Sequence, residues 1–390
     1  MASTPVYLDH AATSPMRPEA LTAMTAELVA VGNPSSLHTS GRRARRVVEE
    51  SRESIAAALG VSAGDVVFTS GGTEADNLAV KGLYRARRAA DPRRTRVLAS
   101  AVEHHAVLDP VEHLGTREGA EVSWLEVDEL GRLRLDVLEK ELESAAGSTA
   151  LVTVMWANNE VGTTQPIAEI ARMCADHGVP LHTDAVQALG HLDVDAGAVD
   201  SLAASGHKVG GPHGVGALVL RRGLDVEPLL HGGGQERDVR SGTLDAPAIA
   251  GFAAAVRGSQ DDLAERTARV RALRDDLVAR VTAEIDGVTR NGDPVDCLPG
   301  IAHLSFDGCA GDALLLLLDS AGVECSRGSA CSAGVPQPSH VLLAMGLDPV
   351  TAMSSLRFSL GGTSTASDVD RLLEVLPGAV ARARRAGPAR

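Results

Sequence analysis

Between about residues 65 and 220, short apolar runs rich in β-branched residues alternate with longer stretches that have a helical spacing of apolar positions. The apolar runs predict strands at 66–70, 96–100, 122–127, 151–155, 181–183, 202–204 and 215–220. The stretches between them predict helices at 74–90, 106–118, 135–145 and 167–177. This alternation predicts an α/β fold with a mostly parallel sheet. Ligands of such sheets bind beyond the carboxyl ends of the strands.

The pattern changes after a long, charged helical stretch at 261–285. Beyond it, the sequence predicts strands at 302–306 and 355–359, helices at 312–320 and 367–386, and a Gly/Ser-rich segment between the two halves. These features are typical of a smaller α+β domain. We therefore expect a large domain at 16–257 and a small domain that combines 1–15 with 258–390.

Composition narrows the class of protein. The 390-residue chain carries a net charge of −14, which repels phosphate backbones and disfavours nucleic acid as a direct partner. We interpret the arginine runs at 42–46 and 382–385 as solvated helix faces. The longest apolar run, at 313–318, is far shorter than the roughly 20 residues of a membrane span.

The cysteines and the first residues bear on the cellular compartment. The five cysteines form no CxxC pair and have no metal-ligand spacing, which favours a reducing compartment with free thiols. The run MASTPVYLDH lacks the basic and apolar regions of a secretion signal. We expect a cytoplasmic protein that binds no metal.

Lys208 is the first candidate for chemistry. It lies in SGHKVGGPHG, directly after the predicted strand at 202–204, where small residues allow a tight turn and a close approach of a ligand. A buried lysine can lose its proton and form a Schiff base with an aldehyde cofactor. A lone lysine at a strand end can equally reach into solvent, so Lys208 is only suggestive by itself.

A carboxylate lies 24 residues before Lys208. Asp184 follows the predicted strand at 181–183 and, paired with a pyridinium nitrogen, would keep that ring protonated as an electron sink. Gln187 could bond the ring hydroxyl. Asp184 could instead be an ordinary helix N-cap. Its place beside the strand that precedes Lys208 favours the cofactor interpretation.

A turn at 69–74 predicts a phosphate site. The residues TSGGTE join a strand to a helix and offer free amides and hydroxyls at a positive helix end. The turn matches neither a P-loop nor GxGxxG, so a monophosphate fits better than a nucleotide. Thr73 could also be a simple helix cap.

Two further side chains complete the candidate chemistry. His104 follows the predicted strand at 96–100 and could stack on a flat ring and move protons, or belong to a surface pair with His105. Cys331 lies in GSACSAG, where Gly, Ser and Ala suit an exposed thiol that must reach a substrate. The other four cysteines are interpreted as inert.

Together, these segments closely resemble the NifS/IscS-like cysteine desulfurases, which have the aminotransferase-like fold of pyridoxal-phosphate (PLP) enzymes. The resemblance spans nearly the whole chain. The matching runs are YLDHAATSP (7–15), GNPSSLH (32–38), FTSGGTEADNLAVKG (68–82), VEHHAVLD (102–109), NNEVG (158–162), HTDAVQ (182–187), SGHKVGGPHGVGAL (205–218), HGGGQERDVRSGT (231–243), GSACSAG (328–334) and SLRFSLG (355–361).

The resemblance implies roles for residues around the cofactor ring. Lys208 holds PLP and later moves the Cα proton of the substrate. Asp184 pairs with the ring nitrogen, Gln187 contacts the ring oxygen, and His104 stacks on the ring as acid and base. The Cys331 thiolate attacks the sulfur of L-cysteine, which leaves alanine and a persulfide.

The resemblance also implies which residues hold the phosphate and the substrate. The remaining cofactor-binding residues are Gly72, Thr73, Asn159, Ser205, His207 and, from the other subunit of a homodimer, Thr243. The substrate-binding residues are Asn33, Asn159 and Arg357, the last through a bidentate fork. The segment at about 326–336 resembles the class with a longer, mobile cysteine loop.

Alternatives to a cysteine desulfurase remain at this stage. A selenocysteine lyase or another PLP lyase would share the fold. A non-catalytic sulfur-transfer scaffold would predict loss of Lys208, Asp184, His104 or Cys331, all of which are present. A phosphate-binding or nucleotide module lacks its P-loop. The sulfur acceptor, an iron–sulfur scaffold or a thiolation enzyme, is open, and the short tail after residue 386 puts a cluster scaffold in doubt.

Overall fold

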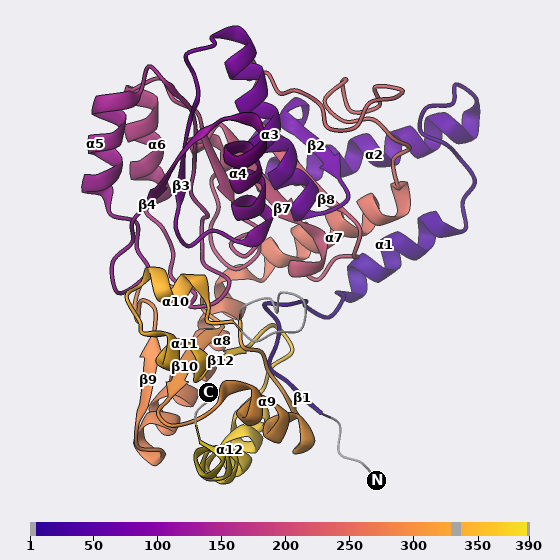
Figure 1. The fold of residues 1–390 in the computed structure, drawn as a ribbon. Helices are drawn as coiled ribbons and strands as arrows, with labels where there is room; N and C mark the ends of the chain where they lie inside the picture. The colour runs from indigo at the N-terminus through magenta and orange to yellow at the C-terminus, as the bar shows by residue number, and fades with distance from the viewer. Residues whose placement is uncertain (1–4, 329–336, 388–390) are drawn as a thin grey trace.

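A seven-stranded sheet forms the centre of the larger part of the computed structural model, which describes residues 5–328 and 337–387 (Figure 1). The strand order is β2-β8-β7-β6-β5-β3-β4. The strands are β2 (Val66–Thr69), β3 (Arg96–Ser100), β4 (Glu121–Leu125), β5 (Thr149–Thr153), β6 (Leu181–Asp184), β7 (Ser201–Ser205) and β8 (Gly216–Leu220).

The expected mostly parallel sheet is confirmed, with β8 as the exception. This strand runs antiparallel to both of its neighbours, β2 and β7. Only residues 206–215 separate β7 from β8, too few for the crossover that a parallel pair requires. The carboxyl ends of β2, β3, β5, β6 and β7 therefore all lie at one edge of the sheet.

Helices cover both faces of this sheet. One face packs on α3 (Gly72–Ala90) and α4 (His105–Glu118), and successive residues of a strand serve opposite faces, as the pleat requires. In β2, for example, Val67 faces α3 and α4 whereas Val66 and Phe68 join the cluster on the other face. The helices of that second face are α2 (Thr39–Ala58), α5 (Leu135–Ala145), α6 (Ile167–Asp176) and α7 (Ala246–Asp261).

In the larger part, three helices have bounds that the sequence pattern did not predict. Helix α1 (Pro18–Leu28) buries only Ala20 fully and packs on α7. The buried stripe of α2 includes Ser51 and Arg52, so its apolar periodicity is faint. Helix α7 is buried on nearly every side and has no polar stripe to reveal its period.

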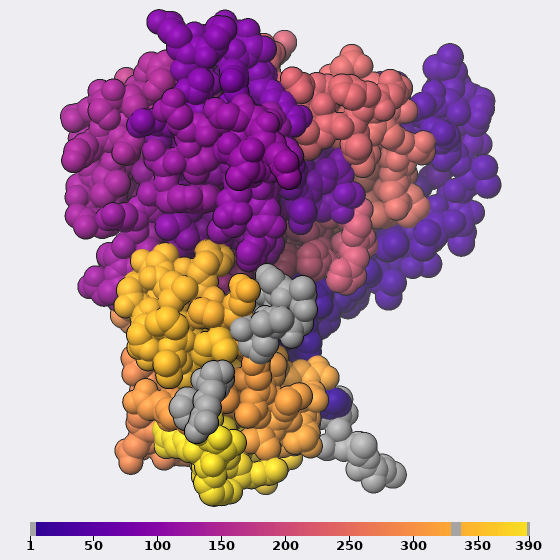
Figure 2. All heavy atoms as spheres, in the orientation of Figure 1, coloured from indigo at the N-terminus to yellow at the C-terminus, as the bar shows by residue number. Residues whose placement is uncertain are grey.

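The smaller part, orange and yellow in Figure 2, lies below the larger part. Its antiparallel sheet has the order β12-β10-β9, formed by β12 (Ser355–Ser359), β10 (Ile301–Phe306) and β9 (Val288–Asn291). A short parallel pair joins β1 (Val6–Tyr7) to β11 (Val323–Glu324). The helices are α8 (Leu263–Glu284), α9 (Gly311–Ser320), α10 (His340–Ala344), α11 (Pro349–Met353) and α12 (Ala366–Ala386).

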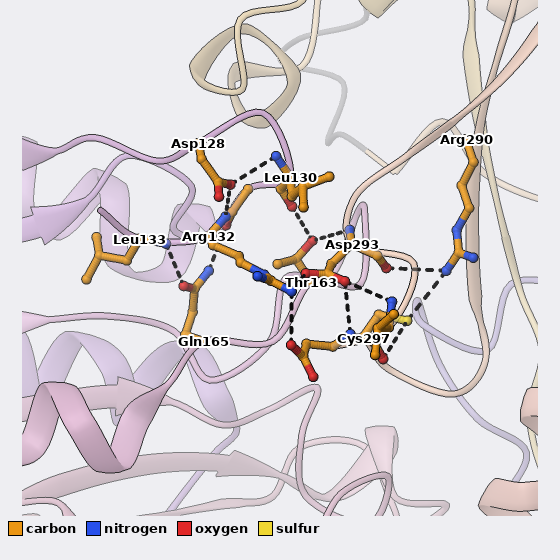
Figure 3. A network of polar contacts seen from close by, with 12 residues as sticks. Asp128, Leu130, Arg132, Leu133, Thr163, Gln165, Arg290, Asp293 and Cys297 are labelled. Carbon is orange, nitrogen blue, oxygen red and sulfur yellow. Dashed lines mark hydrogen bonds and ion pairs between the residues drawn. The ribbon is translucent and has the colours of Figure 1, made fainter. Parts of the chain in front are cut away.

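The two parts meet along α7 and α8 and across a polar junction. Helix α7 packs on α1 and α2, whereas α8 packs on α12, β9 and β10, so the packing partners change at Asp262. The expected domain boundary near residue 257 falls inside α7. Figure 3 shows the junction, where Thr163 donates to the carbonyl of Leu130 at 2.5 Å and accepts from the amide of Asp293 at 3.0 Å.

No helix in the described part of the chain combines the length and the apolarity needed to cross a bilayer.

Candidate active site

A cavity of about 410 Å³ opens where the strand ends of the large sheet meet β12 and the N-terminal segment. It brings together most of the residues that the sequence singled out. Its lining includes Gly72, Thr73, His104, Asn159, Asp184, Gln187, Ser205, His207, Lys208 and Arg357. Asn33 and Thr243 are exposed to solvent and are not part of this lining. Cys331 lies outside the described residues.

Lys208 ends a short 3₁₀ turn, Gly206–Lys208, directly after β7. Its Nζ donates to the carbonyls of Ala11 at 2.6 Å and Ala12 at 2.9 Å. Burial and, to a smaller extent, the nearby Arg357 lower the pKa of Lys208 to about 8, although the negative charges of Asp184 and Asp9 oppose them. About a tenth of such amines are neutral at pH 7, far more than for an ordinary lysine.

Asp184 is the last residue of β6 and lies on the floor of the cavity. One carboxylate oxygen accepts from the amide of Val186 at 2.8 Å. Burial raises the pKa of Asp184, while His104, the Val186 amide and Lys208 favour its ionised form. Gln187 donates to the same Ala11 carbonyl as Lys208, at 2.9 Å. A buried carboxylate of this kind suits a cationic ring nitrogen.

His104 is the N-cap of α4 and accepts from the amide of Ala106 through Nδ1 at 3.1 Å. A neutral ring therefore carries its proton on Nε2. His104 is partly open to solvent. Burial of the imidazole nevertheless lowers the pKa of His104, whereas the negative charge of Asp184 acts to raise it. The imidazole is thus a neutral group at the cavity wall, suited to exchange protons near pH 7.

The first turn of α3 closes one end of the cavity. Gly71 precedes it with a φ of 151°, and the unpaired amides of the first turn point outward beside Thr73. A side chain at Gly72 would bring Cβ within 2.6 Å of Val186 Cγ2. The start of α3 can therefore pack this closely against Val186 only because residue 72 is glycine. A helix N-terminus with Ser205 and His207 alongside suits a phosphate.

Arg357 reaches the cavity from β12 in the smaller part. It is 4% exposed and donates to the carbonyl of Asn159 and to the Asp9 carboxylate, each at 2.7 Å. Its Nε has no partner among the described residues. The guanidinium is thus oriented by fixed contacts and retains hydrogen-bonding capacity for an anion.

Several lining residues were not predicted to have a role. Asp76 lies in the second turn of α3, where its carboxylate contacts His182 Nε2 at 3.1 Å. Burial and the nearby Asp184 raise the pKa of both Asp76 and Glu103. His182, a polar residue in a predicted strand that proves to be fully buried, was the available signal for this buried group.

Described residues before and after the segment that contains Cys331 line the cavity. Ser326 and Gly328 before it and His340 after it all line the cavity. Of the other cysteines, Cys174, Cys297 and Cys309 are buried and Cys325 is partly exposed. Burial raises the pKa of Cys325 to about 12, which disfavours its thiolate.

Comparisons with known proteins agree on one family. A family model for class V aminotransferases matches residues 6–372. An IscS-like cysteine desulfurase of Mycobacterium tuberculosis is 58% identical over 384 residues, 97% of each chain. The cysteine desulfurase IscS of Dictyoglomus turgidum is 41% identical over 98% of this chain and 96% of that protein.

Solved structures show the same likeness. A NifS-like protein superposes with a TM-score of 0.89 at 33% identity, over 97% of this chain and 100% of the other. A structure described as SspA in complex with cysteine gives a TM-score of 0.80 at 33% identity, over 92% of this chain and 99% of the other.

Proposed function

The chain belongs to the class V aminotransferase family, and we propose that it acts there as a cysteine desulfurase. It converts L-cysteine to L-alanine and transfers the sulfur to Cys331 as a persulfide, from which an acceptor protein collects it. The observation that carries this proposal is the convergence of Lys208, Asp184, His104 and Arg357 on one cavity that both ends of the Cys331 segment adjoin.

The cavity fits PLP as the cofactor. Lys208 offers a partly neutral amine for a Schiff base, Asp184 offers a buried carboxylate for the ring nitrogen, and the start of α3 offers amides for the phosphate. Gly72 supports the fit because it allows this helix end to pack closely against Val186, which follows Asp184 by two residues. When bound, PLP supplies an electron sink for the charge left by loss of the Cα proton.

Each residue of the site then has its own role in the reaction. Arg357 binds the substrate carboxylate, and Lys208 removes the proton from Cα. Asp184 holds the positive charge on the ring nitrogen, and His104 exchanges protons at the reacting atoms. The Cys331 thiolate bonds to the substrate sulfur as the bond from that sulfur to Cβ breaks, and the electron pair stays on carbon. A proton delivered to that carbon, together with the return of a proton to Cα, completes alanine.

Chain connectivity supports Cys331 as the sulfur acceptor. Gly328 lines the cavity, and three further residues span at most about 10 Å. The thiol at position 331 is therefore within reach of a substrate held by Arg357. None of the four other cysteines lines this cavity.

We further propose that the active unit is a homodimer. Four exposed apolar side chains lie at the connection of α1 and α2, where a second copy would cover them: Leu28, Val29, Val31 and Leu37, which are 61–85% exposed. Thr243 is exposed and apart from the cavity of its own chain. In the dimer it would reach the phosphate of the partner subunit.

Two variants test the proposed function. Cys331→Ala should keep the absorbance of bound PLP but stop alanine release from L-cysteine. Lys208→Ala should abolish turnover even with PLP present, because no amine then removes the Cα proton. Normal alanine release by Cys331→Ala would refute the nucleophile, and a purified protein that stays colourless with added PLP would refute the cofactor.

A further inference from the structure

A buried turn at Asn158–Glu160 lies between the substrate side of the cavity and the cysteine segment. Asn158 is fully buried, and its side-chain oxygen accepts from the amides of Glu160 at 2.8 Å and Val161 at 3.0 Å. Its Nδ2 donates to the carbonyl of Val102 at 3.0 Å. These three bonds fix the turn on the large sheet and leave it little conformational freedom.

Two hydrogen bonds connect this turn to different parts of the site. The carbonyl of Asn159 accepts from Arg357, which we propose to hold the substrate carboxylate. The carboxylate of Glu160 accepts from the hydroxyl of Ser339 at 2.5 Å. Ser339 directly precedes α10 and caps it, because its oxygen accepts from the amide of Leu342 at 3.2 Å. Glu160 and Ser339 are 3% exposed, so water competes little for their bond.

Helix α10 is docked on the large part by this contact and two others. His340 donates from Nε2 to the carbonyl of Glu103 at 2.9 Å. Val341 and Leu342 are buried in a small apolar cluster with Val102, Met155 and Val161. In Figure 1, α10 lies directly against the loops at the lower edge of the sheet. The residues that directly follow position 337 are therefore held in a fixed place beside the cavity.

The other end of the cysteine segment is fixed as well. Arg327 is 6% exposed and donates to Asp312 of α9 at 2.9 Å and to the carbonyl of Gln337 at 3.4 Å. Gly328 has a φ of +86°, and a Cβ there would lie 3.4 Å from Glu160. Glu160 is thus close to the residues on both sides of the segment.

We propose that Glu160 and Ser339 are positioning residues for the sulfur-transfer step. Through the turn at 158–160, they place the end of the cysteine segment in a set relation to Arg357, so that thiol and substrate sulfur meet at bonding distance. This inference rests on the proposed desulfurase function and adds to it the residues that set the geometry of transfer. Misplacement of a reacting group by about 1 Å can slow a step by about 100-fold.

The test compares two helix caps in the PLP-bound protein. Ser339→Ala removes the cap of α10 together with the bond to Glu160. Asp348→Ala removes the corresponding cap of the next helix, α11, where Asp348 accepts from Val350 and Thr351 and lies away from the cavity lining. Each variant is mixed with L-cysteine for a single turnover. The change in PLP absorbance reports cysteine binding, and mass spectrometry reports the persulfide on Cys331.

We expect Ser339→Ala to form the persulfide about 10- to 100-fold more slowly while cysteine binding stays within about twofold of the unmodified protein. Glu160→Ala should behave alike, and Glu160→Gln, which keeps an acceptor oxygen, should recover most of the rate. Asp348→Ala should transfer sulfur normally.

Three results would overturn the inference: normal transfer in Ser339→Ala, an equal slowing in Asp348→Ala, or an equal loss of cysteine binding and transfer. Failure of the unmodified protein to make alanine would instead refute the proposed function.

Discussion

Gly72 at the start of α3 allows a sharp prediction for cofactor binding. Its replacement by alanine would place Cβ 2.6 Å from Val186 Cγ2, whereas carbon atoms in contact prefer about 3.5–4.0 Å. Either Val186 or the start of α3 must therefore move by about 1 Å. Val186 must leave its preferred χ1 or shift its backbone, whose amide bonds the Asp184 carboxylate, or α3 must withdraw its amides from the phosphate position.

The expected loss follows from this displacement. Overpacking of this kind costs about 1 to 3 kcal/mol, which corresponds to a roughly 5- to 150-fold weaker affinity for PLP. The assay removes PLP from the protein, titrates it back and follows the absorbance of the bound form. Gly378→Ala in α12 is the matched control, because a Cβ at Gly378 meets nothing within 4 Å.

A second substitution tests the cause. Val186→Ala deletes the clashing Cγ2, and the next atoms near the new Cβ are Ser205 Cβ at 3.6 Å and Val186 Cβ at 3.8 Å, both ordinary contacts. The double variant should therefore bind PLP more tightly than Gly72→Ala alone, as a double-mutant cycle would measure. Unchanged affinity in Gly72→Ala, or no recovery in the double variant, would refute the reasoning.

Three further predictions concern charge. Because the neutral amine is the form above its pKa, the rate at which PLP combines with Lys208 should rise with pH to a midpoint near 8; a midpoint near 10 would contradict the effect of burial. Arg357→Ala should raise KM for cysteine about 10- to 100-fold in alanine assays and leave PLP bound, since a charged hydrogen bond contributes about 1.5–3 kcal/mol. Glu236→Ala, which leaves the buried Arg52 guanidinium without its two 2.7 Å bonds, should lower the free energy of unfolding in urea by about 3–5 kcal/mol, and Arg52→Met with Glu236→Ala should lower it less.

The local pattern of the chain predicted much of the site, for a physical reason. Asp184 and Lys208 each follow a predicted strand, and the ends of β6 and β7 meet because these strands are parallel neighbours in the sheet. Arg357 is different because it lies on β12, in the three-stranded sheet. Only the resemblance to a family predicted its role. The ion pair between Arg357 and Asp9 joins residues 348 positions apart, which no local periodicity encodes.

Other features depended on tertiary structure. Nothing in the apolar run at 215–220 distinguishes the antiparallel β8 from its parallel neighbours; the short connection after β7 decides it. Glu160 was part of a recognised run, yet its partner Ser339 is 179 residues away. The expected roles of Asn33 and Thr243 stay predictions, because neither residue lines the cavity of a single chain.

The N-terminal segment has a consequence for how the protein matures. The carbonyls of Ala11 and Ala12 bind Lys208, and Asp9 pairs with Arg357, so this short stretch completes the cavity from outside the large sheet. During synthesis, Asp9 leaves the ribosome 348 residues before Arg357. At about 5–20 residues per second, that interval is on the order of 20–70 s. Asp9 must therefore stay without its Arg357 partner for most of translation, and completion of the cavity becomes a late event.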